Sequence, residues 1–298
     1  MSESAETLRR KLDSAIKLGG VVRVMKALAA SNLGQCERAV EALGEYRATV
    51  ELGLRAGLRE LGGAPGGAAR QSRPDAPAAG AVVFGSDQGL VGRFNETLRD
   101  ALGEAFREAG AKPVVWAVGE RVRDALAEAD LAPAAVHAAP VGVPGIVPLV
   151  AALLGEIEHA RSTRAVREVH LFFQQPGPGS TCAVTRQRLL PLDRRWRDEI
   201  AERPWPTRSV PQVIGSSAAT LRALVGEYLF VSLYAACAYS LAAENLTRLA
   251  AMQRAEQNIE DLQDTLNQAF NRERQTSIDE ELFDVAAGFE VLVNPTRR

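Results

Sequence analysis

Aromatic residues are scarce in this chain of 298 residues, at 5% of the composition, although hydrophobic residues reach 46%. With so few large rings to fill an interior, the sequence favours close helix packing over a bulky globular core. Cysteine is equally sparse, because Cys36, Cys182 and Cys237 stand far apart and are odd in number. This pattern excludes a disulfide framework and zinc-ligand spacing, and it predicts a reducing compartment.

Other features that are missing exclude further classes of protein. The formal net charge is only −2, which argues against a general nucleic-acid binder, because such proteins are usually strongly basic. The three histidines, His137, His159 and His170, lie far apart without a carboxylate or thiol at ligand spacing, so we expect no metal site. No nucleophile-elbow or triad signature is present, and we expect no enzyme activity from this chain by itself.

Long apolar runs are also lacking. The nearest candidate, Tyr228 to Ala243, carries Ser, Tyr and Cys and stops at Glu244, too short for a bilayer span. The opening sequence MSESAETLRRKL is polar and contains no apolar signal core. We therefore expect no segment that inserts into a membrane.

Glycine and proline are absent between Glu227 and Ala287, although the whole chain holds 25 Gly and 15 Pro. Without these helix breakers, a stretch rich in Ala, Leu, Glu, Gln and Arg is predicted to form one long helix. Its apolar residues recur near the 3.5-residue repeat of a left-handed coiled coil. They are Leu246, Leu249, Met252, Ala255, Ile259, Leu262, Leu266 and Phe270.

Residues 1–61 contain no proline and predict a second long helix from apolar residues spaced three and four apart. Ser4, with Thr7 nearby, is a weak candidate for its N-terminal cap. The pair Gly19 and Gly20 predicts a bend or a tight approach by another helix, with a flexible hinge as the alternative. Since the chain returns across an intervening domain, we expect the two helices to pack antiparallel.

Between the helices the sequence changes character. Residues 62–79 are low in complexity and predict a mobile linker, whereas residues 80–192 alternate between strand and helix patterns. Residues 193–215 predict an irregular connection, and residues 216–298 form the C-terminal helix region. The predicted fold class is therefore α/β, with an antiparallel coiled coil of the long N- and C-terminal helices and an inserted α/β, Rossmann-like domain.

Three stretches leave alternatives open. GSDQGLVG after the first strand is similar to a phosphate-binding loop, but it lacks a Lys-Ser/Thr pair and GxGxxG, and Asp87 would repel a phosphate. The apolar stretch after Phe270 predicts either insertion into another protein's cavity or docking against the first helix. The basic run in residues 9–26 is either a solvated face or a contact for an acidic partner loop.

Three segments together resemble the gamma subunit of rotary F-type ATP synthases. The N-terminal helix matches at Met25-Lys26 and Ala29-Ala30-Ser31, and FGSDQGLVGRFN is similar to that family's turn after the first strand. The third segment begins at Ser240. Its matching positions are Glu244, Arg248, Ala251-Met252, Asn258, Leu262, Asn271, Arg274-Gln275, Ile278 and Glu281. Departures at Leu18-Gly19-Gly20, Arg93 and Asp279 resemble a divergent bacterial branch, some of whose members are thought to pump sodium.

The resemblance implies a central-stalk rotor that couples ion-driven rotation to ATP synthesis or hydrolysis. Its partners would be the alpha, beta and epsilon subunits and the membrane c-ring, with no nucleic acid and no cofactor of its own. The site would be a beta-subunit contact made by Met25, Lys26, Arg248, Arg274, Gln275 and Glu281. The implied location is peripheral, on the cytoplasmic side of a bacterial inner membrane.

Two other functions compete with this interpretation. A structural coiled-coil tether with an α/β recognition module would self-associate through its terminal helices. A small-molecule enzyme would use the α/β domain, on the strength of the glycine-rich turn alone. The sequence does not decide between proton and sodium coupling, because the membrane ring selects the ion.

Overall fold

In a computed structural model the described residues are 4–60, 79–107, 112–163, 165–178, 181–192, 194–202, 205–206, 208–209, 212 and 214–293. They form two compact units, which we describe separately. The helix-pair unit comprises residues 1–28 and 249–298, and the α/β unit comprises residues 29–248. Residues 62–78 of the predicted linker lie outside the described part of the chain. The domain boundaries derived from the sequence stay predictions.

Both long helices that the sequence predicts are present. Helix α1 spans Ala5–Glu60 and helix α6 spans Ser217–Val293. The expected cap of α1 is confirmed, because the backbone N–H of Thr7 donates to Ser4 Oγ at 3.4 Å. Gly226 lies inside α6, where an added methyl group would meet nothing within 4 Å. It costs about 1 kcal/mol of helix propensity but does not end the helix.

Within the helix-pair unit, α1 and α6 run antiparallel, as expected. Lys26 on α1 forms an ion pair with Glu256 on α6. Gly19, which comes earlier in α1, faces Ile259, which comes later in α6. Residue numbers therefore fall along α1 as they rise along α6.

The core between these helices is narrow. Val22, Met252 and Ile259 are 6%, 2% and 7% exposed, and Met25 packs against them. We call this cluster the seam. It is aliphatic and contains no aromatic ring, so its packing relies on the close approach of the two helices.

The pair Gly19 and Gly20 lies within α1, so the helix continues through both residues. A methyl group at Gly19 would touch Ile259 Cγ2 at 3.4 Å, whereas one at Gly20 would meet nothing within 4 Å. The predicted tight approach is thus found at Gly19 alone. A hinge at this pair finds no support in the backbone.

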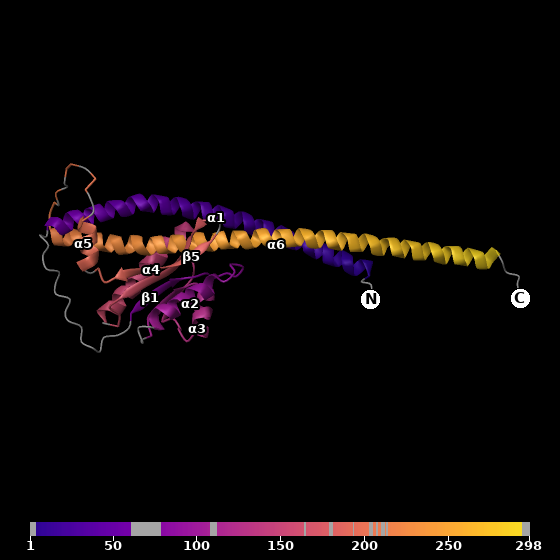
Figure 1. The fold of residues 1–298 in the computed structure, drawn as a ribbon, viewed down its shortest axis with the longest axis horizontal. Coiled ribbons are helices and arrows are strands. Elements are labelled where there is room, and N and C mark those ends of the chain that lie inside the picture. Colours follow the sequence, from indigo (N-terminus) through magenta and orange to yellow (C-terminus); the bar gives the residue numbers. More distant parts are fainter. Residues whose placement is uncertain are drawn as a thin grey trace. The chain divides into compact units, whose positions relative to one another are not determined.

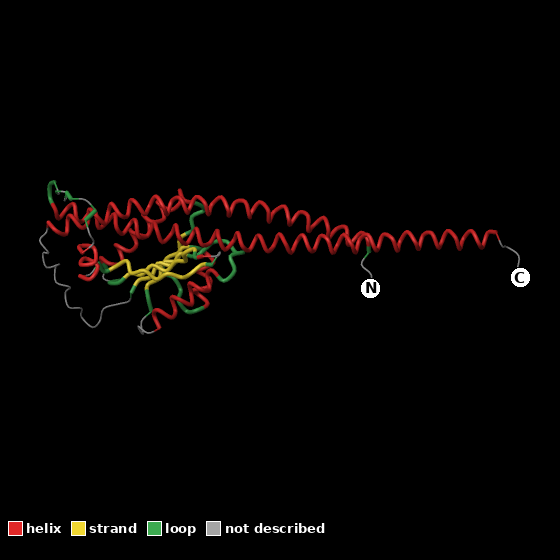
Figure 2. The backbone as a smooth tube through the Cα atoms, turned by 45° about the horizontal axis from the view of Figure 1, so that its top comes forward, coloured by secondary structure: helices red, strands yellow, loops and turns green. Residues whose placement is uncertain are grey.

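Past Leu266, α6 continues to Val293 beyond the start of α1 (Figures 1 and 2). At 1.5 Å per residue, the part after Phe270 extends roughly 35 Å. Its large apolar side chains are exposed: Leu282 63%, Phe283 75%, Val285 71% and Phe289 69%. Docking of this stretch against the first helix, one of the two predicted arrangements, is therefore wrong.

The α/β unit is built on a five-stranded sheet in the order β3-β2-β1-β4-β5. Its first four strands in that order are parallel, and β5 pairs antiparallel with β4. The strands are β1 Gly80–Phe84, β2 Val114–Val118, β3 Ala135–His137, β4 Val169–Pro176 and β5 Cys182–Leu190. The parallel pairing confirms the predicted α/β class. The strand order reverses between the neighbouring strands β1 and β4.

Helices cover both faces of this sheet, as Figure 1 shows. On one face α2 (Phe94–Arg107) and α3 (Glu120–Glu128) pack against alternate β1 residues Ala81 and Val83. On the other face α4 (Ile146–Ser162) and α6 pack against Val82 and Phe84. The two-residue period of β1 therefore supplies both cores.

The stretch Tyr228 to Ala243 of α6 is at the centre of the second core. It contributes Leu233, Ala236, Cys237 and Leu241, and Cys36 of α1 joins the same cluster. This confirms the prediction that the apolar stretch contacts both the first helix and the α/β domain. The side chains alternate in size with many alanines, which permits the close packing expected from the composition.

Two elements were not expected from the sequence. The short strand β3 follows α3, and helix α5 (Arg194–Glu202) lies in the connection that was predicted to be irregular. Trp196 of α5 packs edge-on against Tyr228 with 5.0 Å between ring centroids. Tertiary packing of one aromatic residue therefore stabilises a helix whose own sequence is mostly charged.

Within the described chain, two helical stretches are long and apolar enough to cross a membrane by length and composition, Val143–Ser162 and Ser217–Ala286. The first contains α4, whose Ile146, Val150 and Leu153 are buried in the sheet core. The second contains the part of α6 that packs against the same core. In both stretches, part of the apolar surface packs inside the protein.

Candidate functional site

The turn after β1 is the place where an α/β sheet of this order would hold a ligand, since strand order reverses beside β1. Asp87 in this turn accepts hydrogen bonds from two backbone N–H groups. Its Oδ1 lies 2.9 Å from the nitrogen of Glu120, the first residue of α3, and its Oδ2 lies 3.0 Å from the nitrogen of Ala139. The carboxylate therefore fills the anion position at the helix N-terminus that a phosphate would need.

The rest of the turn is held as tightly. Asn95 Oδ1 accepts the backbone N–H of Ser86 at 3.1 Å, and Asn95 Nδ2 donates to Ser86 Oγ at 3.0 Å. The carbonyl oxygen of Ser86 accepts the N–H of Arg121 at 3.0 Å. Gly119 has φ 112° and lies so close that a Cβ would be 2.6 Å from that carbonyl oxygen. The turn is thus locked by its own chain, with glycine required at this approach.

Helix α6 closes the crevice above the turn. Ser240 Oγ donates to the carbonyl oxygen of Phe84, the last residue of β1, at 2.6 Å. The cavity that remains between Gly85, Ala139 and Glu244 has a volume of only about 10 Å³. This space holds one water molecule at most, so no nucleotide fits between the turn and α6.

Glu244 forms the polar side of this closure. It is 6% exposed, and its Oε1 lies 2.5 Å from Nη2 of Arg248, which is 9% exposed. Burial raises the pKa of Glu244, and the negative charge of Asp87 raises it further, while Arg248 opposes both effects. The pair connects successive turns of α6 beside the glycine-rich turn.

The residues predicted to contact a beta subunit occupy three different settings. Met25 packs at the edge of the seam, and Lys26 is ion-paired with Glu256. Arg248 is buried against Glu244. The remaining three, Arg274, Gln275 and Glu281, are exposed on the part of α6 beyond α1. Within the helix-pair unit, Met25 and Lys26 lie at the seam, whereas Arg274, Gln275 and Glu281 lie further along α6.

Sequence reasoning missed an exposed apolar stripe on α1. Val21, Val24 and Leu28 are 57%, 60% and 60% exposed and follow a three-and-four spacing on a face separate from Val22. The buried and the exposed stripe follow the same spacing in one stretch of α1, so the buried stripe concealed the exposed one. The role of Glu256 as the ion-pair partner of Lys26 was also missed, because the sequence does not show which charged residue of another helix lies opposite.

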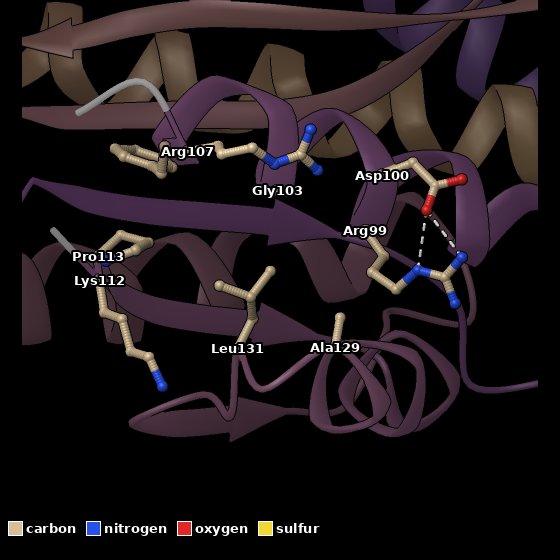
Figure 3. A pocket seen from close by; sticks show the side chains of 9 residues that line it. Arg99, Asp100, Gly103, Arg107, Lys112, Pro113, Ala129 and Leu131 are labelled. Carbon is tan, nitrogen blue, oxygen red and sulfur yellow. Dashed lines mark hydrogen bonds and ion pairs between the residues drawn. The ribbon is translucent and has the colours of Figure 1, made fainter. Parts of the chain in front are cut away.

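A surface pocket of about 380 Å³ lies at the opposite edge of the sheet (Figure 3). Its lining comes from α2, the residues before β2 and those after α3. Arg99 contacts Asp100 at 2.7 Å, and Lys112 is ion-paired with Asp130. Two of the three cations that line the pocket are thus ion-paired, and the pocket lies away from the carboxyl ends where α/β sheets bind ligands.

Among the residues that the structure describes, no group of three or more His, Cys, Asp and Glu side chains could hold a metal ion. His170 instead lies against Glu168, with Nε2 2.9 Å from Oε1, and beside the guanidinium of Arg186. Burial lowers the pKa of His170, and Arg186 lowers it further. This histidine therefore belongs to the packing of β4 against β5.

Together these features define a class of protein: a two-helix shaft whose C-terminal helix is packed into the ligand crevice of an α/β domain. The family model described as ATP synthase matches residues 4–292. The chain belongs to the ATP synthase family, and its curated relatives place it among the gamma chains.

Two of these relatives illustrate the match. The ATP synthase gamma chain of Parafrankia sp. (strain EAN1pec) is 28% identical over 304 residues, covering 99% of each chain. That of Mycolicibacterium paratuberculosis (strain ATCC BAA-968 / K-10) is 24% identical over 308 residues, again covering 99% of each chain. Gamma chains belong to the complex as non-catalytic subunits, because catalysis resides in the beta subunits.

Solved structures show the same fold. A chain of the rotor of Euglena gracilis mitochondrial ATP synthase has a TM-score of 0.61 at 13% identity, covering 92% of this chain and 98% of that chain. A central-stalk and c-ring structure from Tetrahymena thermophila mitochondrial ATP synthase has a TM-score of 0.54 at 20% identity, covering 79% and 99%. The predicted fold and the predicted rotor family are both confirmed.

Proposed function

We propose that this chain is the rotating shaft of an F-type ATP synthase, turning inside an alpha/beta hexamer as a membrane c-ring drives it. The observation that carries the proposal is the extension of α6 past the start of α1, with Phe283, Val285 and Phe289 exposed. A single helix with bare apolar side chains is costly in water, and burial in a partner's cavity removes that cost. An encircling ring of subunits supplies such a cavity.

The helix-pair unit has the stiffness that a shaft needs. The seam of Val22, Met252 and Ile259 joins two antiparallel helices, and the ion pair of Lys26 with Glu256 links them beside it. The exposed stripe Val21, Val24 and Leu28 adds an apolar surface on a second face of α1. Apolar contacts are non-directional, so such a surface can slide past partners without locking to one of them.

Polar residues on the same unit would give the contacts that depend on angle. Arg274, Gln275 and Glu281 are exposed on α6 and are the proposed contacts with a beta-subunit loop. Met25 and Lys26 stay in the proposed set at the rim of the seam. Arg248 stays in it through its family position alone, since the structure buries its side chain against Glu244.

The remaining partners follow from the proposed role. The epsilon subunit and the c-ring would contact the α/β unit, and the alpha and beta subunits would surround the helix pair. The complex would be peripheral to a bacterial inner membrane on its cytoplasmic side, with no direct insertion of this chain. The packing of α4 and α6 into the protein core supports the last point. The transported ion would be a proton or sodium, as the ring dictates.

Co-purification tests this proposal. The full chain, tagged and co-expressed with the alpha and beta subunits of the same organism, should co-purify with them at one copy per hexamer. A variant carrying Phe283→Ser, Val285→Ser and Phe289→Ser should bind the hexamer more weakly, while Leu90→Ser, at an exposed leucine of the α/β unit, should bind normally. A chain that remains a monomer in the presence of both subunits would rule the proposal out.

A coiled-coil tether is the second candidate, and the exposed stripe of Val21, Val24 and Leu28 favours it. In that case the stripe would pair with a second copy of the chain. Analytical ultracentrifugation separates the two functions, because a tether sediments as a tight homodimer and a rotor subunit does not. Val24→Ser should abolish such a dimer.

A further inference from the structure

The sheet and α6 are joined by hydrogen bonds at the carboxyl edge of the parallel strands. Ser240 Oγ donates to the carbonyl oxygen of Phe84 at 2.6 Å, at the end of β1. Cys182 Sγ, at the start of β5, lies 3.6 Å from the carbonyl oxygen of Ala243 and 3.5 Å from Thr247 Oγ1. These contacts span two neighbouring turns of α6, so they fix where the helix lies along the sheet and how it is rotated.

The rest of this interface is apolar. Phe84, Leu171 and Phe173 of the sheet share one core with Leu233 and Cys237 of α6. Apolar packing supplies most of the attraction but has little direction, so by itself it resists rotation of a helix less than hydrogen bonds do. Directional bonds at the edge therefore add to the packing in fixing the register of α6 on the sheet.

The glycine-rich turn makes this edge rigid. Both carboxylate oxygens of Asp87 are bonded, one to the N-terminus of α3 and one to the backbone after β3. A Cβ at Gly85 would lie 2.3 Å from Val122 Cβ, so the turn and α3 are in the closest contact that the chain allows. Movement of the end of β1 would break these bonds, and the turn thereby supports the carbonyl oxygen that Ser240 uses.

We propose that this group, the sheet–helix joint of Phe84, Asp87, Cys182, Ser240 and Thr247, transmits torque between the α/β unit and α6. The inference rests on the proposed rotor function, in which the α/β unit contacts the ring and the hexamer surrounds the helices. Ser240 and Asp87 act as positioning residues. The contacts between α6 and this edge of the sheet thus serve as a mechanical connection.

Torsional stiffness is the property that distinguishes a torque joint from ordinary packing. In the assembled complex, with the hexamer immobilised and no nucleotide, a gold nanorod is attached to the α/β unit through Glu104→Cys, an exposed position of α2. The variance of the rod's angle reports stiffness. A chain without the new cysteine measures background labelling of Cys182.

The variant Ser240→Ala with Asp87→Asn should raise the angular variance about twofold, because two directional contacts are lost while the apolar core stays. Ser240→Thr keeps the hydroxyl and should restore the wild-type variance. The matched control is Ser232→Ala on the same helix, since Ser232 is 1% exposed and its Oγ has no hydrogen-bond partner among the described residues. It should leave the variance unchanged.

Equal angular variance in the double variant and the wild type would overturn the proposal that the sheet–helix joint transmits torque. If the double variant does not assemble, Ser240→Ala alone is measured against the same control and the same criterion. Failure of the rotor proposal looks different, because the wild-type chain would then not bind the hexamer at all. The two ideas are therefore tested separately.

Discussion

Lys26 of α1 and Glu256 of α6 form an ion pair across the helix seam, 230 residues apart in the sequence. Their side chains are 35% and 19% exposed, so the pair lies at the boundary between the seam and water. Such a pair helps to fix the register of α1 against α6, because two helices joined only by a narrow aliphatic contact could shift by one helical turn.

A double-mutant cycle on this pair measures its contribution. Lys26→Ala and Glu256→Ala should each lower the free energy of unfolding, with a coupling energy of about 1 kcal/mol because the pair is only partly screened. Urea unfolding of the full chain, followed by circular dichroism, gives the four values. The exposed pair Arg10 and Glu6, at 73% and 80% exposure, is the control and should couple far less. A coupling energy no larger than that of the control pair would show that Lys26 and Glu256 do not stabilise the seam.

The seam itself can be located by a matched pair of substitutions. Ile259→Asp should lower the free energy of unfolding by about 3 kcal/mol, since Ile259 is 7% exposed and an aspartate there would be buried without a partner. Leu262→Asp should cost clearly less, because Leu262 is 47% exposed. The sequence pattern treats the two as equivalent. Similar losses for both variants would place the seam elsewhere.

The fold follows from the sequence to a large extent because its signals are long. The absence of glycine and proline after Glu227 predicts most of α6, and strand and helix alternation predicts the parallel sheet. The short elements were missed for a physical reason. Strand β3 has three residues and α5 nine, and both depend on tertiary contacts such as Trp196 with Tyr228.

The candidate site was predictable only in part. Asp87 was expected to exclude a phosphate, and the structure adds that its carboxylate occupies the helix N-terminus itself. The burial of Arg248 against Glu244 could not be predicted, because the same i, i+4 sequence spacing occurs for ion pairs on solvent-exposed and on buried helix faces. Whether such a pair is buried depends on which face of the helix the neighbouring elements cover.

The buried thiols give a prediction in reactivity. Burial raises the pKa of Cys36 to about 11 and raises that of Cys237 as well, so both stay protonated at neutral pH. Iodoacetamide should therefore leave both unmodified in the native chain and react with them only in denaturant. Mass spectrometry of tryptic peptides checks this. Rapid native labelling of Cys237 would show that α6 is not packed as described.

Glu244 gives a prediction in pH dependence. Its folded-state pKa is raised, so the folded chain binds this proton more tightly than the unfolded chain does. Its contribution to stability is therefore present below the ordinary carboxyl pKa and is lost as pH rises through the raised value. Glu244→Gln, which keeps an acceptor for Arg248, should gain stability relative to the wild type as pH rises from about 4 to 7.

Unfolding curves of both chains across this range give the difference at each pH. Glu6→Gln, at an exposed carboxylate of α1, is the control and should show a small change with pH. If the wild type instead gains stability relative to Glu244→Gln as pH rises, Arg248 and the surrounding dipoles stabilise the charged form of Glu244. That result would contradict the direction argued from burial.

The central claim is that the paired helices turn as one shaft inside a catalytic ring. The most direct measurement immobilises a hexamer assembled with this chain, attaches a probe to the α/β unit through Glu104→Cys, and records the probe's angle after ATP is added. The account predicts continuous rotation in one direction that stops when ATP is removed. A bound probe that only fluctuates about a fixed angle while the hexamer hydrolyses ATP would contradict it.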